Sequence, residues 1–124
     1  LEDSVLMPGF IANPGPWYAA ANAFVLSSEY EGFGNVLVEA LEYGLPIVST
    51  DCIAGPSEIL EGGRYGRLVP VGDAGAMAEA MKQALIAPFD RDALQARAKD
   101  FSLEVIADRY LEVLFPGWRP EATA

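Results

Sequence analysis

The stretch from Ala23 to Thr50 constrains the fold more than any other part of the chain. A short apolar run, Ala23–Leu26, has the length and the β-branched or aromatic content of a buried strand. Apolar residues then repeat at helical spacing, and Gly44-Leu45-Pro46 ends that helix. Ile47–Thr50 follows as a strand apolar enough to be buried on both faces, which is typical of a parallel sheet. This order predicts an α/β fold with a parallel sheet, right-handed crossovers and flanking helices.

The loop before the central helix predicts an anion site. It holds two glycines, Gly32 and Gly34, whose lack of a Cβ lets a ligand approach the backbone. We expect Asn35 to be the N-cap of the helix, which leaves the next backbone N–H groups as free donors. These donors belong to Val36, Leu37 and Val38. With the positive end of the helix dipole they suit a phosphate group.

Two glutamates accompany this loop. Glu39 lies one turn into the helix, on the same face as Asn35, where its carboxylate is placed to accept hydrogen bonds from ribose hydroxyls. Glu31 lies in the loop just outside the strand end. A structural interpretation stays open for each feature: Glu31 as a solvated loop charge, Glu39 as a solvated helix charge, and the glycines as turn formers.

Composition narrows the function classes. The chain has 18 acidic residues, 8 basic residues and a net charge of −10, which argues against nucleic acid as a partner. The same field would repel a phosphate-bearing ligand, so phosphate binding must rest on local donors or on basic residues elsewhere. The single cysteine, Cys52, excludes an internal disulfide and suits a reducing cytoplasm. The absence of histidine removes His-based triads, general bases and metal sites from this chain.

The length of 124 residues allows one small domain with a real core. We expect it to span residues 1–115, followed by a tail at 116–124. Because the chain begins with Leu1, we expect a piece of a longer protein. Further strands are predicted at Ser4–Met7 and Tyr65–Val69, and short helices at Trp17–Ala21 and from Pro56 onward.

Three helices are predicted in the second half, with Asp73, Asp90 and Ser102 as caps. The core-facing side chains of the first are predicted to be Met77, Ala80, Met81, Ala84 and Leu85. Those of the last are predicted to be Leu103, Ile106, Tyr110, Val113 and Leu114.

The segment EYEGFGNVLVEALEYGLPIVSTD strongly resembles the donor-site segment of retaining glycosyltransferases of the GT-B fold, family 4, also called glycosyltransferase group 1. It carries the family's Glu-x7-Glu pattern, Glu31 to Glu39. The match continues through GFIANPGPWYAAANAFVLSS before it and GPSEIL and YGRLVPVGD after it, up to about Ala87. Two glutamates eight residues apart occur by chance in many helices, whereas the combined string is specific.

The resemblance implies the later part of the C-terminal, donor-binding domain of such an enzyme, an incomplete Rossmann-like parallel sheet flanked by helices. The implied reaction moves a sugar from a nucleoside-diphosphate sugar, a UDP-sugar by overall likeness, to a glycan or lipid-linked acceptor with retention, and it requires no metal or other cofactor. By resemblance, Glu31 contacts sugar hydroxyls or the reacting centre as the catalytic residue, and Glu39 holds the ribose. The implied donor-site residues are Glu31, Gly32, Phe33, Gly34, Asn35, Val36, Leu37 and Glu39.

The resemblance also implies parts that we expect to lie outside this chain. They are the N-terminal acceptor domain of the parent protein and the first two strands of this domain, which carry an Arg-x4-Lys clamp for the diphosphate. None of the basic residues Arg64, Arg67 and Lys82 falls where the clamp belongs. In the family the last helix packs toward the other domain, which would account for an exposed Trp118 in the irregular tail.

Several minor assignments stay open. Pro8–Phe10 would contact the nucleobase through the backbone, or form an ordinary turn with a buried Phe10. Asp51 and Glu58 would face the donor sugar, although the helix dipole is a sufficient reason for Glu58. Cys52 is interpreted as a small filler because no base or cation lies near it in the sequence.

Two alternative functions and two locations remain. Another GT-B enzyme, such as a sugar-nucleotide epimerase, would share the fold, but GFGNVLVEAL argues against it. A non-catalytic nucleotide-sugar-binding module is the second alternative. The parent protein is expected in the cytoplasm, or peripherally at the inner face of the membrane.

The expected strand order also predicts an assembly. In the order 3-2-1-4-5-6, the Ala23–Leu26 strand has lost one neighbour. An open apolar edge invites pairing. We therefore expect either Val5–Met7 beside that strand or a homodimer formed through it.

Overall fold

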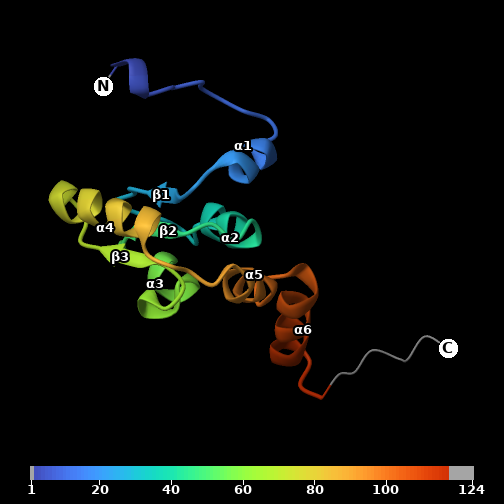
Figure 1. Ribbon diagram of the computed structural model, residues 1–124. Coiled ribbons are helices and arrows are strands. Elements are labelled where there is room, and N and C mark those ends of the chain that lie inside the picture. The colour runs from blue at the N-terminus through green and yellow to red at the C-terminus, as the bar shows by residue number, and fades with distance from the viewer. Residues whose placement is uncertain (1, 118–124) are drawn as a thin grey trace.

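Three parallel strands form the centre of the computed structural model, which describes residues 2–117 (Figure 1). They are β1 (Phe24–Leu26), β2 (Ile47–Thr50) and β3 (Arg67–Val69), in the spatial order β1-β2-β3. Each neighbouring pair is parallel, with Val25 opposite Val48 and Ser49 opposite Leu68. The predicted parallel sheet flanked by helices is confirmed.

Helices connect and cover these strands. Two are short 3-10 helices, η1 (Glu2–Ser4) and η2 (Glu61–Gly63). The α-helices of the described part are α1 (Gly15–Ala20), α2 (Asn35–Glu42), α3 (Pro56–Ile59), α4 (Ala74–Ile86), α5 (Arg91–Lys99) and α6 (Leu103–Leu114). The three predicted caps are confirmed, because the side chains of Asp73, Asp90 and Ser102 each accept a hydrogen bond from a backbone N–H three residues later.

The core lies between the sheet and the helices α2, α3 and α5. All four residues of β2 are buried, as its apolar sequence predicted. Leu37 and Leu41 of α2 and Ile59 of α3 are fully buried beside them. Helix α5 packs against α2 and contributes Leu94 and Ala98, while α4 packs against β2 and β3. This block fixes the start of α2, where the predicted anion site lies.

The predicted strand at Ser4–Met7 is wrong. Helix η1 ends at Ser4, and the chain that follows has no regular structure, with Val5, Leu6 and Met7 exposed. Phe10 is also exposed rather than buried in a turn. The segment runs away from the sheet (Figure 1), so its predicted pairing with β1 is wrong as well. A strand forms only where a neighbour accepts its hydrogen bonds, and no other strand within residues 2–117 flanks β1 on the side away from β2.

The predicted inward faces of two helices are only partly correct. In α4, Ala84 is buried and Met77 and Ala80 are partly buried, but Met81 and Leu85 are exposed. Helix α6 has no buried residue and lies beyond α5, away from the sheet (Figure 1).

Four of the five α6 side chains predicted to face inward are exposed: Leu103, Tyr110, Val113 and Leu114. Helical periodicity identifies the apolar face of α6 but does not supply the surface that covers it. Trp118 lies outside the described residues.

Candidate functional site

The loop between β1 and α2 begins where β1 and β2 end. The pairing of these strands continues as an isolated parallel bridge between Tyr30 and Ile53. The hydroxyl of Thr50, at the end of β2, donates to the backbone carbonyl of Ser28 at 2.5 Å. These contacts fix both loops at the carboxyl end of the sheet, where open α/β sheets bind ligands.

Glu31 is tied to the end of β1. The Ser28 hydroxyl donates to Oε1 of Glu31 at 2.6 Å, and the Glu31 side chain is half-buried. A hydrogen bond to an ionised carboxylate is short and comparatively strong. Glu31 is therefore held over the strand ends, and its second carboxylate oxygen is available to accept another donor.

The start of α2 differs from the prediction by one residue. The N-cap is Gly34, with φ 95°, and Asn35 is the first helical residue. Glycine adopts this left-handed conformation readily, whereas Asn35 is not needed as a cap. The Leu37 N–H donates to the Gly34 carbonyl at 2.9 Å, so the prediction that this N–H is free is wrong.

The two loop glycines have different surroundings. A Cβ on the buried Gly34 would lie 3.4 Å from Cδ1 of Leu37 and 3.7 Å from Cδ1 of Ile59, so this position serves helix packing. A Cβ on Gly32 would meet nothing within 4 Å. The open space for a ligand beside the backbone is therefore at Gly32.

Gly55, directly before α3, lets the Glu31–Gly34 loop pack closely against it, a role that the sequence did not reveal. Its φ is 102°, and a Cβ there would lie 1.8 Å from the Phe33 carbonyl oxygen. Only a residue without a side chain allows the loop to rest against the entry to α3. Its place directly before Pro56, at the start of a predicted helix, was the available signal.

An aromatic and cationic cluster supports Phe33 from the other side. The Phe33 ring packs edge-on against Phe101 with centroids 5.6 Å apart, and the Arg97 guanidinium lies 4.7 Å from the Phe101 centroid. Arg97 also donates to the backbone carbonyls of Ile59 at 2.9 Å and Glu58 at 2.7 Å. Ile59 and Glu58 lie 38 and 39 residues before Arg97 in the chain, so no local sequence pattern predicted the cluster.

Glu39 is engaged by a residue that the sequence analysis did not assign to the site. The Tyr18 hydroxyl donates to Oε2 of Glu39 at 3.0 Å, which links α1 to α2. Glu39 is half-buried and Tyr18 is buried. Burial first, and then the hydrogen bond and negative charge of Glu39, raise the pKa of the Tyr18 hydroxyl well above its ordinary value.

The basic residues considered earlier lie away from the loop or are engaged elsewhere. Arg67 begins β3, at the opposite end of the sheet. Arg64 pairs with Glu61 at 2.8 Å on η2, and Lys82 lies 3.8 Å from Glu79 on α4. None of the three supplies a cationic clamp for a diphosphate at the loop.

The neighbouring loop after β2 carries the residues whose roles were left open. Asp51 and Glu58 are exposed, whereas Cys52 is buried, in agreement with its interpretation as a small filler. Within residues 2–117 no group of three or more acidic or cysteine side chains is placed to hold a metal ion. No helix in that same part combines the length and the apolar character that a membrane span requires.

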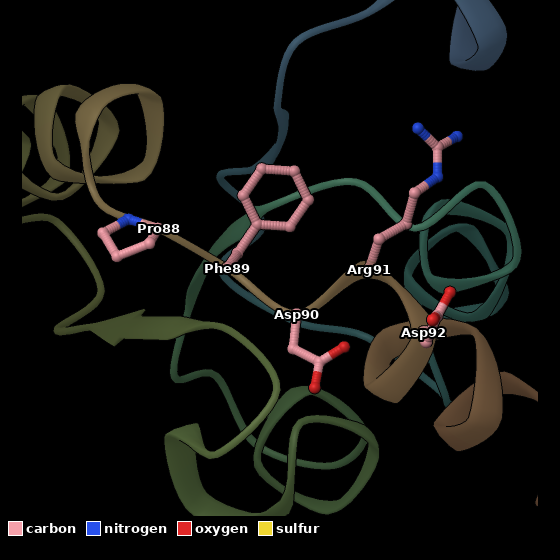
Figure 2. A pocket seen from close by; sticks show the side chains of 5 residues that line it. All are labelled: Pro88, Phe89, Asp90, Arg91 and Asp92. Carbon is pink, nitrogen blue, oxygen red and sulfur yellow. The ribbon is translucent and has the colours of Figure 1, made fainter.

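A separate hollow borders the connection between α4 and α5. Figure 2 shows the Phe89 ring and the Asp90 carboxylate on opposite sides of this connection, with Arg91 directed toward α2. Arg91 donates to the Tyr43 carbonyl at 2.8 Å, just past the C-terminal end of α2. The hollow therefore lies at the end of α2 away from the Glu31–Gly34 loop.

Comparisons with known proteins agree with this architecture. LpsE of Rhizobium meliloti, a lipopolysaccharide core biosynthesis glycosyltransferase, is 36% identical over 115 residues, which cover 89% of this chain and 34% of LpsE. A Campylobacter jejuni enzyme is 35% identical over 99 residues, which cover 80% of this chain and 27% of that enzyme. Its name is N-acetylgalactosamine-N,N'-diacetylbacillosaminyl-diphospho-undecaprenol 4-alpha-N-acetylgalactosaminyltransferase.

The solved structure of TarM superposes with a TM-score of 0.77 at 26% identity, covering 93% of this chain and 24% of TarM. The chain thus spans about a third or less of the length of these proteins. The structural neighbours are glycosyltransferases of the GT-B fold. Residues 1–86, more than half of the chain, match the family described as glycosyl transferases group 1, and the chain belongs to that family.

Proposed function

We propose that this chain is the donor-binding part of a retaining family 4 glycosyltransferase, which transfers a sugar from a UDP-sugar to a glycan or lipid-linked acceptor. The observation that carries the proposal is the loop Glu31–Gly34, fixed at the carboxyl ends of β1 and β2 directly before the N-terminus of α2. Family membership and relatives named for lipopolysaccharide and undecaprenol-linked substrates support it.

The site residues receive the following roles in this proposal. Glu31, held by Ser28, contacts the sugar hydroxyls or the reacting centre. The backbone from Phe33 to Leu37 holds the sugar and the phosphates, without the Leu37 N–H, which donates to the Gly34 carbonyl. The open approach for the ligand is at Gly32. Glu39 holds the ribose. Charge develops on the leaving diphosphate in the transition state, and dipoles already fixed toward it lower the barrier. The reaction needs no metal in this proposal.

The ribose role of Glu39 is tested by a matched pair on one helix. In the full-length protein, Glu39→Gln is expected to weaken donor use more than the control Glu42→Gln, which changes an exposed residue of the same helix. We expect a loss of about 1–3 kcal/mol for Glu39→Gln, because a buried polar partner is left unpaired. Donor KM and kcat are measured for both variants. Equal, near-wild-type values would remove the ribose assignment.

The loop itself is tested by two glycines. Gly55→Ala must displace the Phe33 carbonyl and should abolish donor binding, because a Cβ would lie 1.8 Å from that oxygen. Gly32→Ala meets no atom within 4 Å and should leave the fold intact. Urea unfolding together with donor titration separates the two effects. A Gly55→Ala protein with wild-type donor affinity would contradict the proposed position of the loop.

A nucleotide-sugar-binding module without transfer activity is the second candidate for the isolated chain. It is favoured by the net charge of −10 and by Arg64, Arg67 and Lys82 lying away from the loop. We expect the 124-residue chain alone not to transfer sugar, because the opposed acceptor supplies much of the rate by proximity. Calorimetry with UDP should show weak binding, and sub-micromolar affinity would show that the clamp is not needed.

Assembly and location are further parts of the proposal. Within residues 2–117, β1 is an edge strand, and we propose that the isolated chain forms a homodimer through this edge. Sedimentation with and without Val25→Pro tests this, since proline removes a ladder donor. An unchanged mass would end the idea. The full-length protein is proposed to act in the cytoplasm or peripherally at the inner membrane face, which cell fractionation tests.

A further inference from the structure

Tyr18 is held in place more firmly than a surface tyrosine. Its ring stacks on Tyr43 with centroids 5.3 Å apart and tilts against Phe24 at 5.7 Å. Only 9% of its surface is exposed. A ring packed on two sides has little freedom to turn, so the position of its hydroxyl is fixed by the core rather than by solvent.

The fixed hydroxyl ends at one oxygen of Glu39. The Tyr18 hydroxyl donates to Oε2 of Glu39 at 3.0 Å, and the two residues, on α1 and α2, lie 21 positions apart in the chain. Because burial and the adjacent carboxylate raise the pKa of Tyr18, its hydroxyl keeps its proton at any ordinary pH and remains a donor. Oε2 is thus occupied, and Oε1 is the atom left to accept a further hydrogen bond.

We propose that Tyr18 is a positioning residue for Glu39, holding Oε2 so that Oε1 is presented to a ribose hydroxyl of the donor nucleotide. The inference rests on the proposed function, and it assigns to α1 a part in nucleotide recognition. Without the Tyr18 hydroxyl, Glu39 regains several rotamers and must lose them again on binding. A carboxylate oriented before the ligand arrives avoids that loss.

The chain offers a matched pair of variants for the test. Tyr18→Phe removes the hydroxyl and keeps the ring. Tyr43→Phe does the same for the ring stacked on Tyr18, and the Tyr43 hydroxyl makes no hydrogen bond to the Glu39 side chain in the described structure. In the full-length protein, Tyr18→Phe should raise donor KM by about 5–30-fold with kcat little changed. Tyr43→Phe should leave both unchanged.

Two further measurements separate positioning from a purely structural tether. In a Glu39→Gln background, Tyr18→Phe should cause no further rise in donor KM, because the two residues act as one unit. The preference for UDP over 2′,3′-dideoxy-UDP as inhibitors should shrink in Tyr18→Phe and persist in Tyr43→Phe. Thermal unfolding reports the fold of each variant, and Tyr18→Met, which fills the space without a donor, replaces Tyr18→Phe if that variant does not fold.

The possible results separate a failure of the positioning role from a failure of the proposed function. A lowered melting temperature with an unchanged donor KM, or an additive KM rise in the Glu39→Gln background, would overturn the positioning role while leaving the proposed function intact. A folded wild-type protein that neither binds nor uses any nucleoside-diphosphate sugar would overturn the proposed function first, and this inference with it.

Discussion

Helices α2 and α6 are both amphipathic, yet only one of them is buried. The eight residues of α2 place Leu37, Ala40 and Leu41 in the core, whereas the twelve residues of α6 place none there. The longer helix therefore adds less to the core. The difference is one of surroundings, since β1, β2, α3 and α5 surround α2, while α6 lies beyond α5 (Figure 1).

The segment before α1 is apolar but exposed, as α6 is. Its exposed apolar side chains are Val5, Leu6, Met7 and Phe10, although valine and leucine are buried in the core of the same chain. The contrast teaches that the central block buries its own apolar side chains, whereas nothing within residues 2–117 covers the two apolar ends. Four predictions test this division, beginning with the largest expected effect on stability.

The core of α2 should give the largest effect. Leu37 is fully buried, and Leu37→Ala is expected to cost about 3 kcal/mol of unfolding free energy from lost burial and the cavity left behind. Val113 of α6 is 78% exposed, so Val113→Ala should change that free energy by less than about 0.5 kcal/mol. Urea unfolding of both variants checks the contrast. Equal losses would show that α6 is packed in solution.

Arg97 should come second. Its side chain is 15% exposed and bonds two carbonyls at the end of α3 and the Asp100 carboxylate. Arg97→Gln is expected to cost about 2 kcal/mol, because it removes charged hydrogen bonds and leaves the part-buried Ile59 carbonyl without its donor. Arg64→Gln, which breaks an exposed pair with Glu61, serves as the control and should leave the urea midpoint unchanged. If Arg64→Gln lowered the urea midpoint as much as Arg97→Gln, the partly buried bonds of Arg97 would contribute no more to stability than an exposed ion pair.

Removing a helix cap should cost more stability at α5, which is part of the core, than at α6, which lies outside it. Asp90 accepts from the Ala93 N–H at 3.0 Å, and Asp90→Ala is expected to cost about 1 kcal/mol because α5 is part of the core. Ser102 accepts from the Val105 N–H at 3.4 Å, and Ser102→Ala should only reduce the helix content of α6. Circular dichroism and urea midpoints together distinguish global unfolding from local fraying. A midpoint shift for Ser102→Ala equal to that for Asp90→Ala would contradict the division.

The smallest effect is expected for the exposed apolar face of α6. Val113→Ser combined with Leu114→Ser removes two large apolar side chains that are 78% and 64% exposed. The unfolding free energy should stay within about 0.5 kcal/mol of the wild type. The two substitutions should, however, raise solubility, because less apolar surface is exposed. A clear loss of stability would mean that this face is covered by another part of the same chain.

The candidate site divides in the same way. The position of the Glu31–Gly34 loop could be predicted, because strand ends in a parallel sheet meet at one edge. The exact cap could not, since Gly34 takes a left-handed conformation that depends on its packing against Leu37 and Ile59. Contacts such as Tyr18 with Glu39 join residues on different helices, which no periodicity reports.

From α1 onward the sequence by itself determined the order of strands and α-helices, together with the three caps in the second half and the family, because each depends on residues close together in the chain. Only the tertiary structure decided which apolar faces are buried and which partners Glu31, Glu39 and Arg97 have. The physical reason is that helical and strand propensities act over a few neighbouring residues, whereas burial requires a second surface. For Val5–Met7 and α6 the described chain does not supply that surface.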